Sequence, residues 1–388
     1  MSLNLNKLFN RNDLPSFSKN ITPSPKDEAT LRKARTEILD YLKRAIPQWL
    51  QTNLGEKPEH PPRFRTQGSW AYRTCNAPCQ LPPQEMDWDL GIYLPVSLWE
   101  DNQVHPKVAA QGYYEMVRKL MKPLAEEKNW TLAEKPTCVR VILGNGTRAH
   151  IDLPLYAAPD DEFVHIKEVK LAKAALTAES HVLVADSQQT ITWTSIKHIA
   201  LAHKDGTWGA SDPGRVIEWF DRKIERHDEQ LRRVCRYLKA WRDQTWSSGG
   251  PSSIVLMVCA AQTLDRAQLA FTGRDDLALR HVLTELPSQL RAAIKEPMIN
   301  PDEDLNRLSV DERLEASRNA GEFLSAMNEA LAQSFNNRHR ALSRVRVQLG
   351  DRFPNDPDGI TPDDGQTNIR MTTAEPRPRA PIIPTKAG

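Results

Sequence analysis

The spacing of apolar residues predicts one long amphipathic helix near the start of the chain. Leu31, Ile38 and Leu42 recur at intervals that place them on one helical face. Ser24 and Pro25 precede this run, and they are the residue types favoured at the N-cap and the first helical position. We expect the helix to begin there and to end between residues 47 and 55, where a proline and then a glycine interrupt the pattern.

The apolar runs that follow predict strands first and helices later. Short apolar or alternating runs predict strands at residues 63–67, 84–94, 138–143 and 148–157. One longer stretch with helical periodicity, residues 112–127, predicts a helix between the second and third of these strands. The last two strands are expected to form a hairpin around the glycine-rich turn at residues 144–146. From about residue 212 the pattern is helical, so the predicted fold class is α+β, a mixed sheet with flanking helices joined to a C-terminal helical lobe.

Three regions are therefore expected. Residues 1–210 would form the core with its N-terminal spine helix, and residues 211–353 a helical lobe that completes a cleft. From Pro354 onward prolines, aspartates and glycines dominate and the periodicity disappears, so residues 354–388 are predicted to be a flexible tail.

Composition and charge narrow the class of protein. The 388 residues carry a formal net charge of +2, which argues against a protein that coats nucleic acid. There is no apolar run of about 18 residues and no secretory signal, so we expect a cytoplasmic protein without a membrane span. Five cysteines without a signal sequence favour reduced thiols, and Cys75 and Cys79 lack the second ligand pair of a zinc finger.

Two like charges on one strand pose the main chemical question. Asp87 and Asp89 flank Trp88, so both carboxylates would lie on one face about 6.5–7 Å apart while the indole joins the core. Unpaired carboxylates at that separation repel each other, and Mg²⁺ with its preference for oxygen ligands would resolve the conflict. Asp152, between apolar neighbours in a predicted strand, would supply the third carboxylate. A single Asp-x-Asp pair is more often a solvated strand edge.

A phosphate-binding turn stands upstream of these carboxylates. Gly68 and Ser69 lie between a predicted strand and a short helix, where a glycine permits close backbone approach and the serine hydroxyl can donate to an anion. A phosphate cradle beside a carboxylate metal site is the apparatus of nucleotidyl transfer, in which two metal ions about 3.5–4 Å apart activate the attacking hydroxyl and hold the triphosphate.

These segments together resemble a known family. "QGSWAYRT", "MDWDLGIYLP" and "HIDLPLYA" look like the cGAS/DncV-like nucleotidyltransferases (CD-NTases) of bacterial anti-phage (CBASS) signalling, and are most similar to the DncV-type branch. "GPSSIVL" and "LGDRFP" also resemble family segments, so the resemblance covers nearly the whole chain. It implies a polymerase-β-like core and an enzyme that joins NTPs, ATP among them, twice to close a cyclic di- or trinucleotide.

The resemblance also implies roles for individual residues. Asp87, Asp89 and Asp152 would bind two Mg²⁺ ions, for which Mn²⁺ can substitute, and Asp152 would favour deprotonation of the attacking hydroxyl. The implied nucleotide contacts are Gln67, Gly68, Ser69 and Tyr72 for the donor, Lys239 and Ser253 for the triphosphate, Arg140 on the acceptor side, Ser211 for a further contact and Asn300 for a base. From the residues alone, the charged face that carries Lys239 is typical of a solvated helix face, and Tyr72 could equally be a packing aromatic.

The tail and the alternatives complete the expectations. A frayed end is the ordinary interpretation of "RPRAPIIPTKAG", whereas the resemblance implies an E1/E2-like ligase that conjugates the protein through Gly388. An activating partner is a further expectation. Two other hypotheses remain open: a terminal transferase acting on RNA or protein, which the low net charge disfavours, and a catalytically silent nucleotide-binding scaffold, which would gain nothing from buried like charges.

Overall fold

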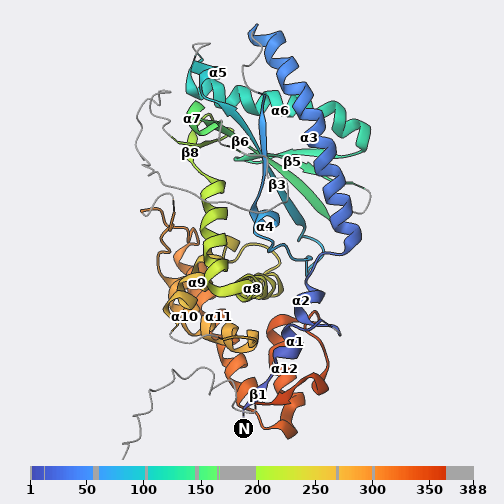
Figure 1. Cartoon of the computed structure of the whole chain (residues 1–388), viewed down its shortest axis with the longest axis vertical. Helices are drawn as coiled ribbons and strands as arrows, with labels where there is room; N and C mark the ends of the chain where they lie inside the picture. Colours follow the sequence, from blue (N-terminus) through green and yellow to red (C-terminus); the bar gives the residue numbers. More distant parts are fainter. Residues whose placement is uncertain are drawn as a thin grey trace, which may run out of the picture.

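The computed structural model describes residues 2–12, 14–55, 61–100, 104–144, 148–163, 166, 198–267, 271–298 and 302–363. These residues form two lobes, one built on a sheet with flanking helices and one built of helices (Figure 1). The predicted α+β fold class is therefore confirmed. None of the described helices is both long and apolar enough to cross a membrane.

A seven-stranded mixed sheet forms the centre of the first lobe. Its order is β2-β3-β6-β5-β4, with β7 beside β6 and β8 beside β7. The central pair β3 and β6 is parallel, whereas β2 pairs with β3, and β5 with β6, antiparallel. The strands are β2 (Arg63–Gln67), β3 (Met86–Pro95), β4 (Thr131–Glu134), β5 (Cys138–Ile142), β6 (Ala149–Ala158), β7 (Ala200–Ala202) and β8 (Trp208–Ala210).

Two long helices cover the sheet. In α3 (Pro25–Leu54), the Ser24 hydroxyl accepts a hydrogen bond from the Asp27 amide, and Gly55 ends the helix in a left-handed conformation with φ of +76°. α3 packs its apolar stripe together with α6 (Pro106–Lys128) into the core of this lobe. The short helices of the lobe are α4 (Gly68–Ala71), α5 (Ser97–Glu100) and α7 (Asp160–Phe163).

The second lobe is helical around one apolar core. Its longest helix, α8 (Pro213–Thr245), is broken at Asp228, and the two parts run in different directions in Figure 1. The other elements are α9 (Ser253–Arg266), α10 (Asp275–Arg291), α11 (Val310–Ala332), α12 (Arg338–Leu349) and the 3₁₀ turns η2 (Phe335–Asn337) and η3 (Pro357–Gly359).

The first residues of the chain belong to the helical lobe, which corrects the predicted 1–210 core. β1 (Leu3–Asn4), α1 (Asn6–Phe9) and α2 (Phe17–Asn20) lie among the C-terminal helices in Figure 1. Phe9 and Phe17 are fully buried there, each within 5.5 Å of the Phe353 ring. The core therefore begins only at α3, because these N-terminal apolar residues find their partners more than 200 positions away.

The C-terminal end of the helical lobe is also longer than predicted. β9 (Thr361–Pro362) pairs with β1, and Ile360 is buried in the lobe's core. The Asp363 carboxylate forms an ion pair with the buried Arg274 at 3.0 Å, and Arg274 also forms an ion pair with Asp276. The predicted tail, which began at Pro354, thus includes residues that this hydrogen-bonded network fixes to the lobe.

A glutamine joins the two lobes beside the cleft. The Gln84 carboxamide oxygen accepts from the amides of Cys79 and Gln80 at 2.9 and 3.0 Å. Its nitrogen donates to the carbonyls of Asp243 and Trp246 at 2.7 and 2.9 Å. The last carbonyls of a helix lack partners within the helix, so the loop that leads into β3 satisfies the end of α8 and holds the lobes together.

Candidate active site

The central strands place the predicted carboxylates next to one another. Because β3 and β6 are parallel, Asp89 lies beside Asp152 and Asp87 beside His150 in the register, and residues paired in this way share a face of the sheet. Trp88 points to the other face, where it is buried and stacks on Trp70 with 4.4 Å between ring centroids. The predicted separation of acids and indole is confirmed.

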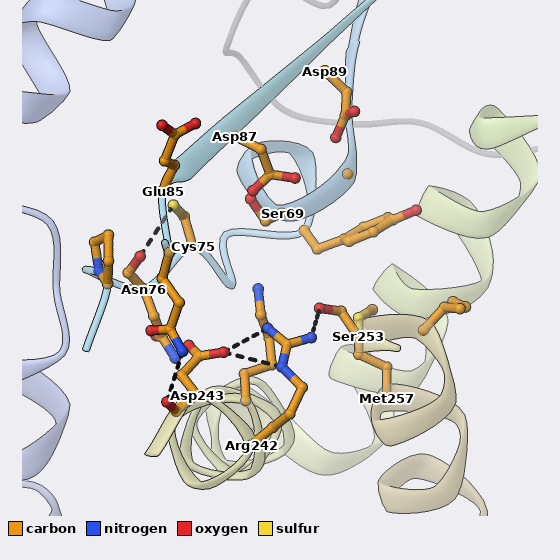
Figure 2. A pocket seen from close by; sticks show the side chains of 16 residues that line it. Ser69, Cys75, Asn76, Glu85, Asp87, Asp89, Arg242, Asp243, Ser253 and Met257 are labelled. Atoms are coloured by element: carbon orange, nitrogen blue, oxygen red, sulfur yellow. Dashed lines mark hydrogen bonds and ion pairs between the residues drawn. The ribbon is translucent and has the colours of Figure 1, made fainter. Parts of the chain in front are cut away.

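A cavity of about 450 Å³ lies where this face meets the helical lobe. Figure 2 shows Asp87, Asp89 and Ser69 on one side and Arg242 and Ser253 on the other. Seven of the predicted site residues line it: Gly68, Ser69, Tyr72, Asp87, Asp89, Lys239 and Ser253. Segments from both halves of the sequence therefore build one pocket.

The turn at Gly68 is shaped by its contact with Asp89. Gly68 has φ of +60°, and a Cβ atom built on it would lie 2.0 Å from Asp89 Oδ2. Only glycine accommodates both the left-handed backbone and this close carboxylate. The neighbouring Ser69 hydroxyl is buried beside the Cys75 thiol and has no hydrogen-bond partner of good geometry among the described residues, so it is available to a ligand.

The electrostatics of the acids favour a cation. Burial raises the pKa of Asp89 well above its usual range, and the charges of Asp87 and Asp152 raise it further. Asp152 is neutralised within the protein, because Arg140 forms a bidentate ion pair with it, both contacts being 2.7 Å. Among the described residues no three His, Cys, Asp or Glu side chains form a ready metal-binding cluster.

The donor set nevertheless fits a divalent ion. Asp87 and Asp89 offer oxygen ligands whose mutual repulsion a hard cation would relieve. Asp152 lies beside Asp89 in the sheet register, and Arg140 forms an ion pair with its carboxylate. The role of Asp152 as a metal ligand stays a prediction, and a metal bound there would share the carboxylate with the guanidinium.

The opposite wall of the cavity is basic. Lys239 on α8 is 5% exposed and donates from Nζ to the Thr74 carbonyl at 2.8 Å. Burial lowers the pKa of this amine because the charged form is poorly solvated. Arg232 on the same helix is also buried. The alternative of a solvated charged face is therefore wrong, and Lys239 faces the carboxylates.

Several lining residues were not predicted from the sequence. These are Cys75, Asn76, Pro78, Gln84, Glu85, Arg242, Asp243, Ile254 and Met257. Arg242 and Glu85 had a detectable signal: Arg242 stands one helical turn after Lys239, and Glu85 precedes Asp87 by two residues. Asp243 lies on α8, and the others come from the loop before β3 and from α9, where no local pattern marks a ligand contact.

Other predicted contacts lie outside the cavity lining. Gln67 is buried, donates to the Tyr93 hydroxyl at 2.6 Å and accepts from the Tyr156 hydroxyl at 3.0 Å. Ser211 lies beside the same Tyr156 hydroxyl. Asn300 and Gly388 fall outside the described residues. The roles of these four residues stay predictions.

Comparison with known proteins decides the family. The model of the DncV-like cyclic GMP-AMP synthase nucleotidyltransferase domain matches residues 62–156, and that of the cyclic GMP-AMP synthase C-terminal domain matches residues 228–361. A cyclic GMP-AMP synthase from Vibrio cholerae is 33% identical over an alignment of 314 residues, which covers 76% of this chain and 68% of that protein. The chain belongs to the DncV-like nucleotidyltransferases.

Solved structures agree with this membership at the level of the fold. A variant of the Vibrio cholerae di-nucleotide cyclase DncV superposes with a TM-score of 0.74 at 23% identity, covering 93% of this chain and 99% of that one. A structure of Vibrio cholerae DncV with the linear intermediate 5′ pppA(3′,5′)pG has a TM-score of 0.70 at 22% identity, covering 96% of this chain and 100% of that one.

The family assignment covers both walls of the cavity. The DncV-like nucleotidyltransferase segment contains Gly68, Ser69 and the three aspartates, and the DncV C-terminal segment contains Lys239 and Ser253. The protein is thus a nucleotidyltransferase, as the sequence predicted. Ser211 falls between the two matched segments.

Proposed function

We propose that this protein makes a cyclic di- or trinucleotide from NTPs, ATP among them, with Mg²⁺ as its metal. One observation carries the proposal: a single cavity has Asp87 and Asp89 on one wall and Lys239 and Ser253 on the other. Two metal-bridged carboxylates facing a basic wall suit a nucleoside triphosphate. The relatives named cyclic GMP-AMP synthases support a product that is a cyclic dinucleotide.

Each side chain has a defined task in this proposal. Asp87 and Asp89 would hold Mg²⁺, or Mn²⁺ in its place, and the bound metal supplies Lewis-acid stabilisation of the transferring phosphoryl group. The unpartnered Ser69 hydroxyl donates to a phosphate oxygen beside the Gly68 turn. Lys239 and Ser253 bind the triphosphate from the helical lobe, and Tyr72 lines the cavity while its ring makes a T-shaped contact with Phe220.

The Arg140–Asp152 pair joins the proposed acceptor side of the site to its acids. Arg140 donates to both oxygens of Asp152, so the carboxylate is less basic and a weaker metal ligand than it would be without the guanidinium. We expect the acceptor nucleotide to draw the guanidinium toward its own phosphates, which frees Asp152. This accounts for the acceptor-side role implied for Arg140.

The function is tested by incubating the purified protein with labelled NTPs and Mg²⁺. We expect a product that resists phosphatase, and we expect Asp87→Asn with Asp89→Asn to abolish it, since the double variant removes both charges. A product that remains phosphatase-sensitive, or labelled nucleotides added to supplied RNA, would indicate a terminal transferase instead. A cellular phenotype unchanged in the double variant would indicate a silent scaffold.

We also propose that the product signals in anti-phage defence in the cytoplasm and that an E1/E2-like ligase conjugates the chain through Gly388. The support is the family membership. Deleting Ala387 and Gly388 should abolish conjugates when the ligase is co-expressed. Undiminished conjugates would refute this role of the C-terminus.

A further inference from the structure

Arg242 is a second cation on the basic wall of the cavity. It follows Lys239 by three residues on α8, so the two side chains leave neighbouring positions of one helix face. Its Nη1 donates to the Ser253 hydroxyl at 3.1 Å, and Figure 2 shows its guanidinium in the cavity between Ser253 and Asp243. The side chain is 21% exposed, so a ligand can reach it.

The contacts of Arg242 are arranged around Asp243. Nε and Nη2 both donate to the same oxygen, Asp243 Oδ1, at 3.0 and 2.7 Å. Consecutive residues on a helix do not normally face each other, so this pair forms only because both side chains turn toward the cavity. The Asp243 carbonyl is itself fixed by Gln80 and Gln84 from the other lobe, at 3.0 and 2.7 Å.

A triphosphate needs more positive charge than Lys239 provides. The cavity walls include the acids Glu85, Asp87 and Asp89 besides Asp243, and the only other cation among the described lining residues is Lys239. A guanidinium stays charged at every physiological pH and presents a planar fork that matches phosphate oxygens. Arg242 also donates to the hydroxyl of Ser253, the residue proposed to bind the triphosphate, so its guanidinium lies where the phosphates would bind.

We propose that Arg242 binds the triphosphate together with Lys239 and Ser253, and that Asp243 is a positioning residue which holds the guanidinium in place. This inference rests on the proposed function, since it names a further contact in the same nucleotide site. Phosphate oxygens would take the place of the Ser253 hydroxyl as acceptors of Nη1, while Asp243 keeps Nε and Nη2 oriented.

The test compares ligands that differ only in phosphate number. 2′,3′-Dideoxy-ATP and 2′,3′-dideoxy-AMP lack the attacking hydroxyl, so calorimetry in Mg²⁺ measures binding without turnover. Loss of a charge-assisted contact should make Arg242→Ala bind the triphosphate about 10- to 100-fold more weakly and the monophosphate at most about threefold more weakly. Arg242→Lys keeps the charge but lacks the planar guanidinium, so its affinity for the triphosphate should lie between those of Arg242→Ala and the parent.

A double-mutant cycle separates positioning from direct contact. Asp243→Asn should weaken triphosphate binding about three- to tenfold. The double variant, Asp243→Asn with Arg242→Ala, should bind the triphosphate as weakly as Arg242→Ala alone, because Asp243 acts through the arginine. Arg222→Ala is the matched control: it removes the same charge from an exposed position of α8 and should bind both ligands like the parent. Should Arg242→Ala fail to fold, Arg242→Lys carries the comparison.

Two results would overturn the inference. One is parental affinity for the triphosphate in Arg242→Ala; the other is an equal loss for both ligands, which indicates a general structural defect. A parent protein that shows no preference for the triphosphate would instead contradict the proposed function itself, so the two failures are distinguishable.

Discussion

Replacing Gly68 by alanine should damage catalysis far more than folding. The substitution carries two costs of different kind. The first is backbone strain, because φ is +60° and a non-glycine residue in this region costs about 1–2 kcal/mol. The second is steric, because the new Cβ would stand 2.0 Å from Asp89 Oδ2. Relief of that contact requires the carboxylate to move by about 1 Å.

A shift of that size matters because Asp89 is a proposed metal ligand. Misplacement of a catalytic group by about 1 Å costs about 100-fold in rate, so we expect Gly68→Ala to lose about two orders of magnitude in turnover of labelled NTPs. The free energy of unfolding should fall by only about 1–2 kcal/mol. Initial rates and denaturant unfolding, measured on the same preparations, separate the two effects.

Gly273→Ala is the matched control. Gly273 has φ of +70°, but nothing lies within 4 Å of the position that its Cβ would take. It should therefore show a similar loss of stability with parental turnover. If Gly68→Ala retains turnover within about threefold of the parent, the contact between Gly68 and Asp89 does not position the carboxylate and this reasoning is refuted.

Two further predictions concern the joint between the lobes and the charge of the site. Gln84→Ala removes four hydrogen bonds and should lower the free energy of unfolding by about 2–4 kcal/mol in denaturant titrations. Gln333→Ala loses one exposed bond at the end of α11 and should change the free energy of unfolding by less than about 0.5 kcal/mol. Equal effects of the two variants would contradict the role of Gln84 in joining the lobes. Because the pKa of Asp89 is raised in the folded state, the unfolded chain loses this proton first, and metal-free protein should lose stability as the pH rises from the ordinary carboxyl pKa toward the raised one. With a chelator present, Asp89→Asn should remove the part of this pH-dependent loss of stability that Asp89 causes, and Asp40→Asn, at an exposed position, should not. An identical dependence of stability on pH in Asp89→Asn and the parent would rule out the raised pKa.

The sequence predicted those parts of the structure that local chemistry decides. Ser24 and Gly55 define both ends of α3 because capping depends on a few adjacent residues. Trp88 and its flanking acids separate onto opposite faces because strand geometry alternates. The positions of the carboxylates on the sheet followed from the same rule, so half of the site could be identified from short segments.

One feature of the site was predictable but was not predicted. A hairpin centred on residue 146 pairs Arg140 with Asp152, and the structure has this register. Opposite charges that face each other across two strands form an ion pair. The Arg140–Asp152 ion pair was therefore implicit in the hairpin that the glycine-rich turn at residues 144–146 suggested.

The remaining differences arise from contacts between distant segments. Phe9 and Phe17 pack beside Phe353, and no periodicity in a short N-terminal run indicates which lobe it joins. The burial of Lys239 likewise depends on the loop before β3, whose Thr74 carbonyl receives its hydrogen bond. Helical spacing identified the charged face of α8 but could not show that another lobe covers it.

The structure explains how a site with so many charges remains stable without its substrates. Two of its charges have partners within the protein, Arg140 for Asp152 and the Thr74 carbonyl for Lys239, while burial and the neighbouring acids raise the pKa of Asp89. A nucleotide and its metal would compete with these partners, which lowers the net affinity for either one alone. In the proposed binding mode they would neutralise both walls of the cavity at once, because the phosphates would face Lys239 and Arg242 while the metal would face the acids. Each therefore reduces the cost of binding the other, and the site favours a metal–triphosphate complex over its separate components.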